Sequence, residues 1–287
     1  MEQNRRFASW AGAILGVLAA LTLNAALAHA SDRDDAVANE EFHQTYPLSG
    51  NGRVELENIN GAVHIATWDQ NQVKVDAVKR AYNEQLLKDA EIRVNRTADS
   101  ISIETHYLQQ DMWHDDHHNP ASVEYTLTVP RNARLDEIKL INGALDISGV
   151  GGEVRASCIN GKLVARGLGA QAKLSTINGP LDANFDRLQA DPIELSSVNG
   201  RVELTLPSDA KASIEAATVH GGIDNDFGLH TNNHRFVGHD LRGEIGGGGV
   251  QIRLNNVNGT IHVRHANDGH PLSPAKDLNR RKDADDI

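Results

Sequence analysis

Acidic and histidine side chains recur at one position of a repeated seven-residue motif, at a spacing that could support chemistry. The motif reads apolar, Asn, Gly, any residue, apolar, any residue, apolar, and its clearest copy is residues 141–147 (INGALDI). Strands stacked in a sheet lie ~4.8 Å apart. Asp182, Glu203 and Asp224 are therefore predicted to be successive like charges on one face. The complete row, four residues after each motif Asn or its replacement, is His64, Asp146, Val164, Asp182, Glu203, Asp224 and His262.

This row fits three kinds of surface. Retaining glycosidases use two carboxyl groups ~5–5.5 Å apart, so the row is compatible with cleavage of a glycosidic bond. Carboxylate oxygens are also the ligands of hard cations, so a strip that binds a cation or another ligand is a second interpretation. Lys162, Arg166 and Arg201 fall on the same face and can neutralise the carboxylates. We therefore favour a solvated, salt-bridged face and assign no catalytic residue.

A second cluster, residues 114–118, contains His114, His117 and His118 together with two aspartates. Imidazole and carboxylate ligands suit zinc, copper or nickel. The cluster falls in a loop between two expected strands, whereas a closed metal site needs ligands held in fixed geometry. We favour a polar surface loop and assign neither a metal site nor a cofactor, with metal binding as the alternative.

Familiar catalytic and nucleotide-binding motifs are absent from the sequence. It contains no Gly-x-Ser-x-Gly, no His-Glu-x-x-His and no phosphate-binding loop, and the glycine run at residues 246–249 opens no expected helix. Cys158 is the only cysteine, so no disulfide can form within the chain. Other motif copies have Thr176, Ser197 and Thr218 at its position, which predicts a small residue in a stack rather than a reactive thiol.

The spacing of the motif indicates the architecture. Successive second positions are separated by 18, 18, 21 and 21 residues from Asn142 to His220, and by 38 from there to Asn258. We interpret the last interval as two of 19 with one unreadable copy between them. A period near 20 with alternating apolar residues predicts a β-solenoid, in which each repeat buries its apolar face against its neighbours. Asn-Gly would form the corner of each coil, and the flanking apolar residues would fill the interior. A meander of hairpins is the alternative. The motif copies begin at Ile59, Ile141, Ile159, Ile177, Val198, Val219 and Val257.

The first 30 residues have the pattern of a secretory signal peptide. Arg5 and Arg6 precede an apolar run at residues 10–28, and Ala28-His29-Ala30 ends it. An uncleaved membrane anchor is the alternative. Removal of residues 1–30 deletes Glu2, Arg5 and Arg6 and changes the formal net charge from −11 to −12. Such an acidic chain is not expected to bind nucleic acid.

We expect five segments along the chain. Residues 1–30 form the signal peptide and residues 31–47 a flexible lead-in. Residues 48–130 form a β-rich first part of the solenoid domain, with one short helix at residues 83–90. Residues 131–266 form the regular repeats, and residues 267–287 form a disordered polar tail.

The repeated motif resembles that of the bacterial "putative adhesin" family, an exported domain of unknown function. The resemblance also rests on the run at residues 243–249 (GEIGGGG) and the closing copy at residues 257–263, and it covers roughly residues 48–265. It implies a surface role and brings no catalytic motif with it.

These observations lead to one hypothesis and two alternatives. The hypothesis is an exported, non-enzymatic, all-β solenoid in the periplasm or at the cell surface, with no membrane span after signal cleavage. Its extended surface would bind an envelope protein or a glycan, although the low aromatic content of 4% argues against a sugar-stacking cleft. The alternatives are a carbohydrate-active β-helix enzyme that uses the stacked carboxylates, and a periplasmic metal-binding or envelope-stress accessory protein that uses the histidine loop.

Overall fold

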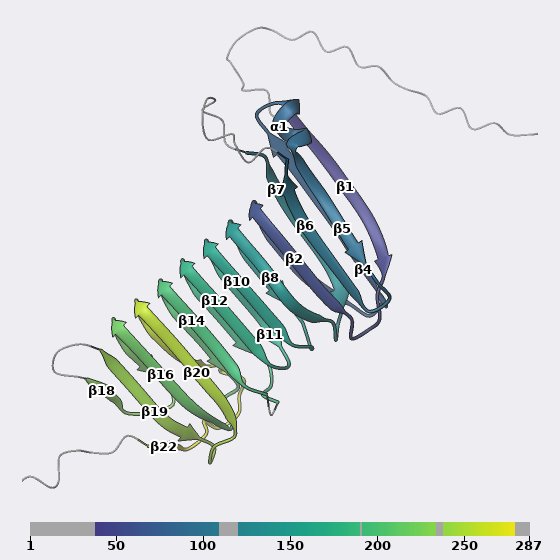
Figure 1. The fold of residues 1–287 in the computed structure, drawn as a ribbon. Helices are drawn as coiled ribbons and strands as arrows, with labels where there is room; N and C mark the ends of the chain where they lie inside the picture. The colour runs from purple at the N-terminus through teal and green to yellow at the C-terminus, as the bar shows by residue number, and fades with distance from the viewer. Residues whose placement is uncertain (1–37, 109–119, 190, 234–237, 279–287) are drawn as a thin grey trace, which may run out of the picture. The chain divides into compact units, whose positions relative to one another are not determined.

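A computed structural model describes residues 38–108, 120–189, 191–233 and 238–278. All of them belong to one compact unit, Ala36–Ile287. Its strands form a 12-stranded sheet, here called the long sheet, and a 10-stranded sheet, the short sheet. The all-β solenoid that the sequence predicts is confirmed (Figure 1).

Each motif copy forms one coil of the solenoid, with a strand in the long sheet, a corner at Asn-Gly or its variant, and a strand in the short sheet. Pairing between successive coils is parallel, whereas a meander of hairpins would give antiparallel pairs. The seven coils are β2 (Arg53–Asn60) with β3 (Val63–Trp68), β8 (Arg134–Asn142) with β9 (Leu145–Ser148), β10 (Val154–Asn160) with β11 (Leu163–Leu168), β12 (Ala172–Asn178) with β13 (Leu181–Phe185), β14 (Ile193–Asn199) with β15 (Val202–Leu206), β16 (Ala212–His220) with β17 (Ile223–Asn225), and β20 (Val250–Asn258) with β21 (Ile261–His265).

The coils are not stacked in chain order at the C-terminal end. β20 lies between β14 and β16, so Asn258 pairs in register with both Asn199 and His220. The expected unreadable copy between His220 and Asn258 is therefore wrong. The described residues of that interval include β18 (Thr231–Asn233) and β19 (His239–Ile245). β19 pairs antiparallel with β16, and β18 pairs antiparallel with β19.

At the N-terminal end, too, the order of the strands in the sheets differs from their order in the chain. β6 (Ser100–Tyr107) and β7 (Ser122–Pro130) pair with β2 and β3 and form one further level outside them. Antiparallel strands β4 (Gln72–Ala81), β1 (Ala38–Pro47) and β5 (Ala90–Arg96) extend the two sheets from there. The expected helix is α1 (Glu84–Asp89), and the side chain of Asn83 caps it by accepting from Leu86 N at 2.9 Å.

Two segments that we expected to be irregular are partly strands. The lead-in is wrong for residues 38–47, which form β1, and the disordered tail is wrong for residues 275–277, which form β22 (Ala275–Asp277) against β19. β1 pairs with β4, and β22 with β19, through backbone N–H and C=O groups, which any residue except proline provides. Side-chain polarity therefore did not indicate these strands.

The core fills the space between the two sheets. The fifth and seventh motif positions point into it, as at Leu145 and Ile147, which are buried. The same holds for Leu181 and Ala183 two coils further on. This inward pattern is the predicted period-two alternation.

Candidate interaction face

The glycine of each corner is required by close stacking. Gly161 has a φ of +155°, and a Cβ on it would lie 1.8 Å from the carbonyl oxygen of Gly143 in the coil before. Gly179 repeats the geometry against Gly161 at 2.0 Å. Among the described residues, Asn267 alone has positive φ without being glycine. The corner asparagines therefore do not share the turn role that we expected of them.

The corner asparagines instead form a hydrogen-bonded ladder. Each side-chain amide donates to the amide oxygen of the coil before it at 2.8–2.9 Å, from Asn258 through Asn199 to Asn60. At the N-terminal end the Tyr107 hydroxyl, whose pKa burial raises to about 12, hydrogen-bonds the Asn60 side chain. A primary amide has two N–H donors and two acceptor lone pairs, so each rung keeps one of each for another partner. The ladder consists of Asn60, Asn142, Asn160, Asn178, Asn199 and Asn258.

An exposed aliphatic strip runs beside this ladder. Its members occupy the first motif position and are 37–43% exposed. The prediction that the residues flanking Asn-Gly fill the interior is therefore wrong at this position. Strand alternation explains it, because the preceding residue, such as Cys158, points inward. Six steps of ~4.8 Å make the strip roughly 29 Å long. In stacking order the aliphatic strip is Ile59, Ile141, Ile159, Ile177, Val198, Val257 and Val219.

Small polar side chains border the strip on its other side. Ser157, Ser175 and Ser196 are two residues earlier on the same outward face and pair in register. We call them the serine row. The row continues with Lys139, which is bound to Glu57 at 2.9 Å, at one end and with Asn255 and Ala217 at the other. The aliphatic strip, the asparagine ladder and the serine row together are called the corner face.

A buried polar row beneath the corner explains Cys158. It pairs in register with Thr176, and Thr176 with Ser197, so the expected stack of small residues is confirmed. These side chains satisfy corner carbonyl groups: Cys158 Sγ lies 3.4 Å from Gly143 O, and Thr176 Oγ1 donates to Gly179 O at 3.0 Å. Burial raises the pKa of the Cys158 thiol to about 11. A thiol that remains protonated is a poor nucleophile.

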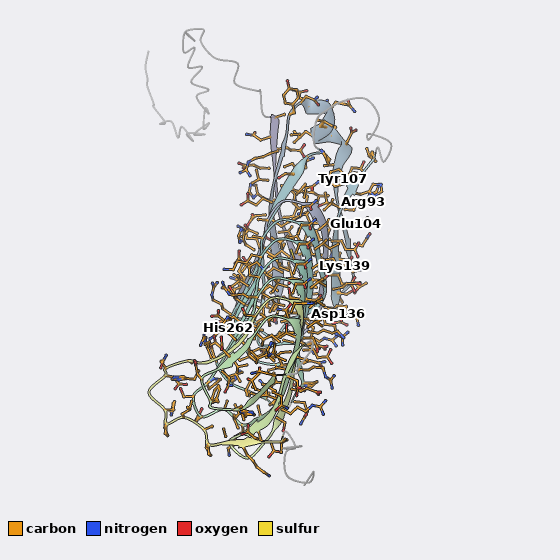
Figure 2. All side chains as sticks on the ribbon, turned by 90° about the vertical axis from the view of Figure 1, so that its left-hand side faces the viewer. Arg93, Glu104, Tyr107, Asp136, Lys139 and His262 are labelled. Carbon is orange, nitrogen blue, oxygen red and sulfur yellow. The ribbon has the colours of Figure 1, made fainter. Side chains whose placement is uncertain are left out.

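The acidic row lies on the short sheet, but its order differs from the one expected. His262 pairs with Glu203 on one side and with Asp224 on the other. Three successive like charges are therefore wrong, because the last coil of the chain is inserted between two earlier ones. Of the three carboxylates only Asp182 and Glu203 are neighbours. In Figure 2, His262 projects on the side opposite to Lys139 of the long sheet.

Cations neutralise this row in the structure. Asp182 binds Lys162 at 3.1 Å and Arg201 at 3.0 Å, and Arg201 also lies 3.3 Å from Glu203. At the two ends, His64 lies 3.3 Å from Asp146, and His262 lies 3.4 Å from Asp224. Exposed pairs of this kind contribute little to stability. They do occupy the carboxylates that a cation site or a glycosidase would need.

The remaining residues of the row lie where strand pairing puts them. Val164 lies between Asp146 and Asp182 and is buried, while Arg166 is exposed on β11. The histidine cluster at residues 114–118 and the signal peptide at residues 1–30 lie outside the described residues. Within the described ranges no group of three or more His, Cys, Asp or Glu side chains could hold a metal ion. No helix in the same ranges is long and apolar enough to cross a membrane.

Comparisons with known proteins identify one family model and several similar solved structures. A solved structure titled a "putative cell adhesion protein", from Clostridium sporogenes, is 12% identical with a TM-score of 0.47, and the match covers 80% of this chain and 99% of that one. A "putative adhesin" from Bacteroides fragilis is 11% identical with a TM-score of 0.38, with coverage of 79% and 97%. No curated protein matches the chain significantly. The family model described as Toastrack DUF4097 matches residues 48–264. The chain therefore belongs to the Toastrack DUF4097 family.

Proposed function

We propose that this protein is an exported, non-enzymatic β-solenoid that binds a partner in the cell envelope or at the cell surface through its corner face. The observation that carries the proposal is the aliphatic strip. Seven branched side chains stay uncovered in one line, whereas singly scattered apolar residues would need no explanation. Export is supported by the signal-peptide pattern of residues 1–30.

The arrangement suits binding along a line better than binding in a cleft. Full burial of an Ile or Val side chain is worth about 1.5–3 kcal/mol, so covering the exposed part of each strip residue is worth about 1 kcal/mol. Every strip residue sits on a strand that is paired with another strand on both sides, so little freedom is lost on binding. The free donor and acceptor of each asparagine add polar specificity along the same line.

The surroundings of the acidic row on the short sheet argue against a catalytic role for its carboxylates. Asp182 and Glu203, which the enzyme hypothesis would use, are both engaged by Arg201. They also lie on an open strand face rather than in a site that excludes water. Glycosidases need one carboxyl group kept protonated by a water-poor environment.

Co-sedimentation with isolated envelopes of the organism that encodes the chain tests the proposal. The strip variant carries Ile159→Ser, Ile177→Ser and Val198→Ser, and the matched control carries Asp182→Asn and Glu203→Gln on the other sheet. Residues 31–287 of the wild type and the control should sediment with the envelopes, and the strip variant should bind at least tenfold more weakly. Far-UV circular dichroism checks that both variants are folded. Equal binding by the strip variant contradicts the proposal.

A further inference from the structure

We propose that the corner face binds a second copy of this chain, with the two solenoids side by side and pointing in the same direction. This inference rests on the proposed function, because it names the partner of the same face. In the proposed dimer the aliphatic strip of each copy lies over the serine row of the other.

The spacing of the strip favours such a partner. Its side chains recur every ~4.8 Å, the distance between hydrogen-bonded strands. Another stacked sheet presents side chains at the same interval, so contacts stay in register along the full strip. Stacked, identical side chains of this kind interdigitate in dry interfaces.

The relief of the corner face is self-complementary. The strip is a row of branched side chains, here called the ridge. Ser157, Ser175 and Ser196 form a row of shorter side chains, here called the groove, about 7 Å away, since two residues of a strand span that distance. A two-fold axis parallel to the solenoid axis, halfway between ridge and groove, places each ridge over the groove of the other copy. Every coil then meets the same coil of its partner, so Ile177 faces Ser175 of the second copy. An axis along the strands would instead set ridge on ridge.

Charge also favours this arrangement. Two copies of residues 31–287, each with a formal net charge of −12, repel one another, yet the three middle coils of the corner face carry only Ile, Val, Ser and Asn. On the long sheet the nearest charged row, which includes Arg155, Lys173 and Glu194, is two residues beyond the serine row. With the axis as proposed, these rows of the two copies lie about 20 Å apart, beyond the Debye length of ~10 Å at 0.1 M salt. On the other side of the corner face, Lys162 and Arg201 lie two residues beyond the ladder, and both are paired with Asp182.

The size of the face determines how tightly the copies bind. From the serine row to the asparagine ladder it is about 10 Å wide, and the facing ladder of the second copy widens the contact to about 14 Å. Over a length of roughly 29 Å this amounts to about 400 Å² per copy, or about 800 Å² in total, below the ~1,200–2,000 Å² of stable complexes. The dimer is therefore weak and forms where copies are concentrated, as on a membrane or cell surface.

Sedimentation equilibrium of residues 31–287 tests the dimer. The wild type should self-associate between about 10 µM and about 1 mM. Ile177→Asp places a charge on the ridge and Ser175→Arg fills the groove, and each should weaken association at least tenfold. Thr205→Arg, at a half-buried outward position of the short sheet, is the control and should leave association unchanged. A wild type that stays monomeric, or single variants that associate normally, would overturn the inference.

Mixing the two variants tests the geometry. In the proposed dimer the new carboxylate of I177D faces the new guanidinium of S175R, and the second contact of that heterodimer is the native one. An equimolar mixture should therefore associate at least tenfold more tightly than either variant alone. Ridge-on-ridge packing predicts no such rescue, and its absence would overturn the arrangement.

Binding to envelopes with and without the chain distinguishes this inference from the proposed function on which it rests. The wild type should bind envelopes of cells that produce the chain and lose this binding with envelopes of a deletion strain. Binding to deletion envelopes that still depends on the strip would overturn the second-copy partner while the proposed function stands. Envelope binding that does not depend on the strip would overturn the proposed function itself.

Discussion

At the residue scale, the two adjacent residues of each corner have separate tasks. Glycine admits the close approach of one coil to the next, and asparagine binds the coils to each other through its side chain. The sequence pattern alone assigned both residues to the turn, because both are common in turns. The backbone angles separate the two tasks, since only the glycine has positive φ.

Gly161→Ala should destabilise the fold by about 3 kcal/mol or more, because its Cβ would lie 1.8 Å from Gly143 O. Gly222→Ala is the matched control, since a Cβ there meets nothing within 4 Å and its φ is not positive. Urea unfolding measures both free energies. Similar losses for the two variants would show that close stacking of the corners does not require glycine.

Cys158 should be almost unreactive in the folded protein. Burial raises its pKa to about 11, so little thiolate exists at pH 8. A disulfide reagent at pH 8 should label the thiol much more slowly in the native protein than in guanidinium chloride. Cys158→Ser should fold normally, since Ser197 occupies the same row. Fast labelling of the native protein would show that the thiol is accessible.

At the scale of the elements, part of the fold was predictable from period and alternation. Both followed from the motif, as did the inward row at Cys158, whereas the short helix α1 was expected from residues 83–90 themselves. The stacking order was not predictable, because β20 resembles any other repeat and nothing in it indicates insertion between β14 and β16. The aliphatic strip could have been found from its signal, an apolar residue that directly precedes an outward Asn in every copy except the one with His220.

The asparagine ladder should contribute measurably to stability. Asn178→Ala removes its bonds to Asn160 and Asn199. A net hydrogen bond is worth about 0.5–1.5 kcal/mol, so the loss should be about 1–3 kcal/mol. Asn255→Ala, at an exposed position outside the ladder, is the control and should change stability by less than ~0.5 kcal/mol. Thermal unfolding followed by circular dichroism compares the two, and equal melting would mean that the ladder contributes nothing.

Docking of the edge strand β1 should weaken as pH rises through neutrality. His43 on β1 hydrogen-bonds Asp76 on β4 at 2.7 Å and Glu41 at 3.1 Å, and these bonds raise its pKa above the ordinary value of 6.5. A raised pKa means that protonation stabilises the docked strand. This stabilisation is complete below pH ~6.5 and is lost as pH rises through the folded-state pKa.

Hydrogen exchange provides the measurement. After correction for the intrinsic pH dependence of exchange, amides of β1 should be less protected at pH 8 than at pH 6, while amides of β7 should not change. His43→Gln should remove the difference. A difference that persists in this variant would assign the pH dependence to another group.

At the scale of the whole solenoid unit, both ends have the same construction. At each end, the outer coil comes from a stretch of chain that lies, in the sequence, between two coils that are adjacent in space. This stretch is β6 with β7, between β3 and β8, at one end, and β16 with β17, between β15 and β20, at the other. Antiparallel strands then continue both sheets at the N-terminal end and the long sheet at the C-terminal end (Figure 1). Solenoids need such capping elements because an open end exposes core and strand edges. The corner face lies between the two capped ends.

Methyl NMR tests most directly whether the corner face is the binding surface. Isoleucine-labelled protein is titrated with envelope vesicles, and each methyl signal reports its own position. Signals of Ile141, Ile159 and Ile177 should broaden first, while the buried Ile65 and Ile147 should change only with the overall mass of the complex. Broadening that is uniform, or that is strongest away from the strip, would contradict the corner face as the binding surface.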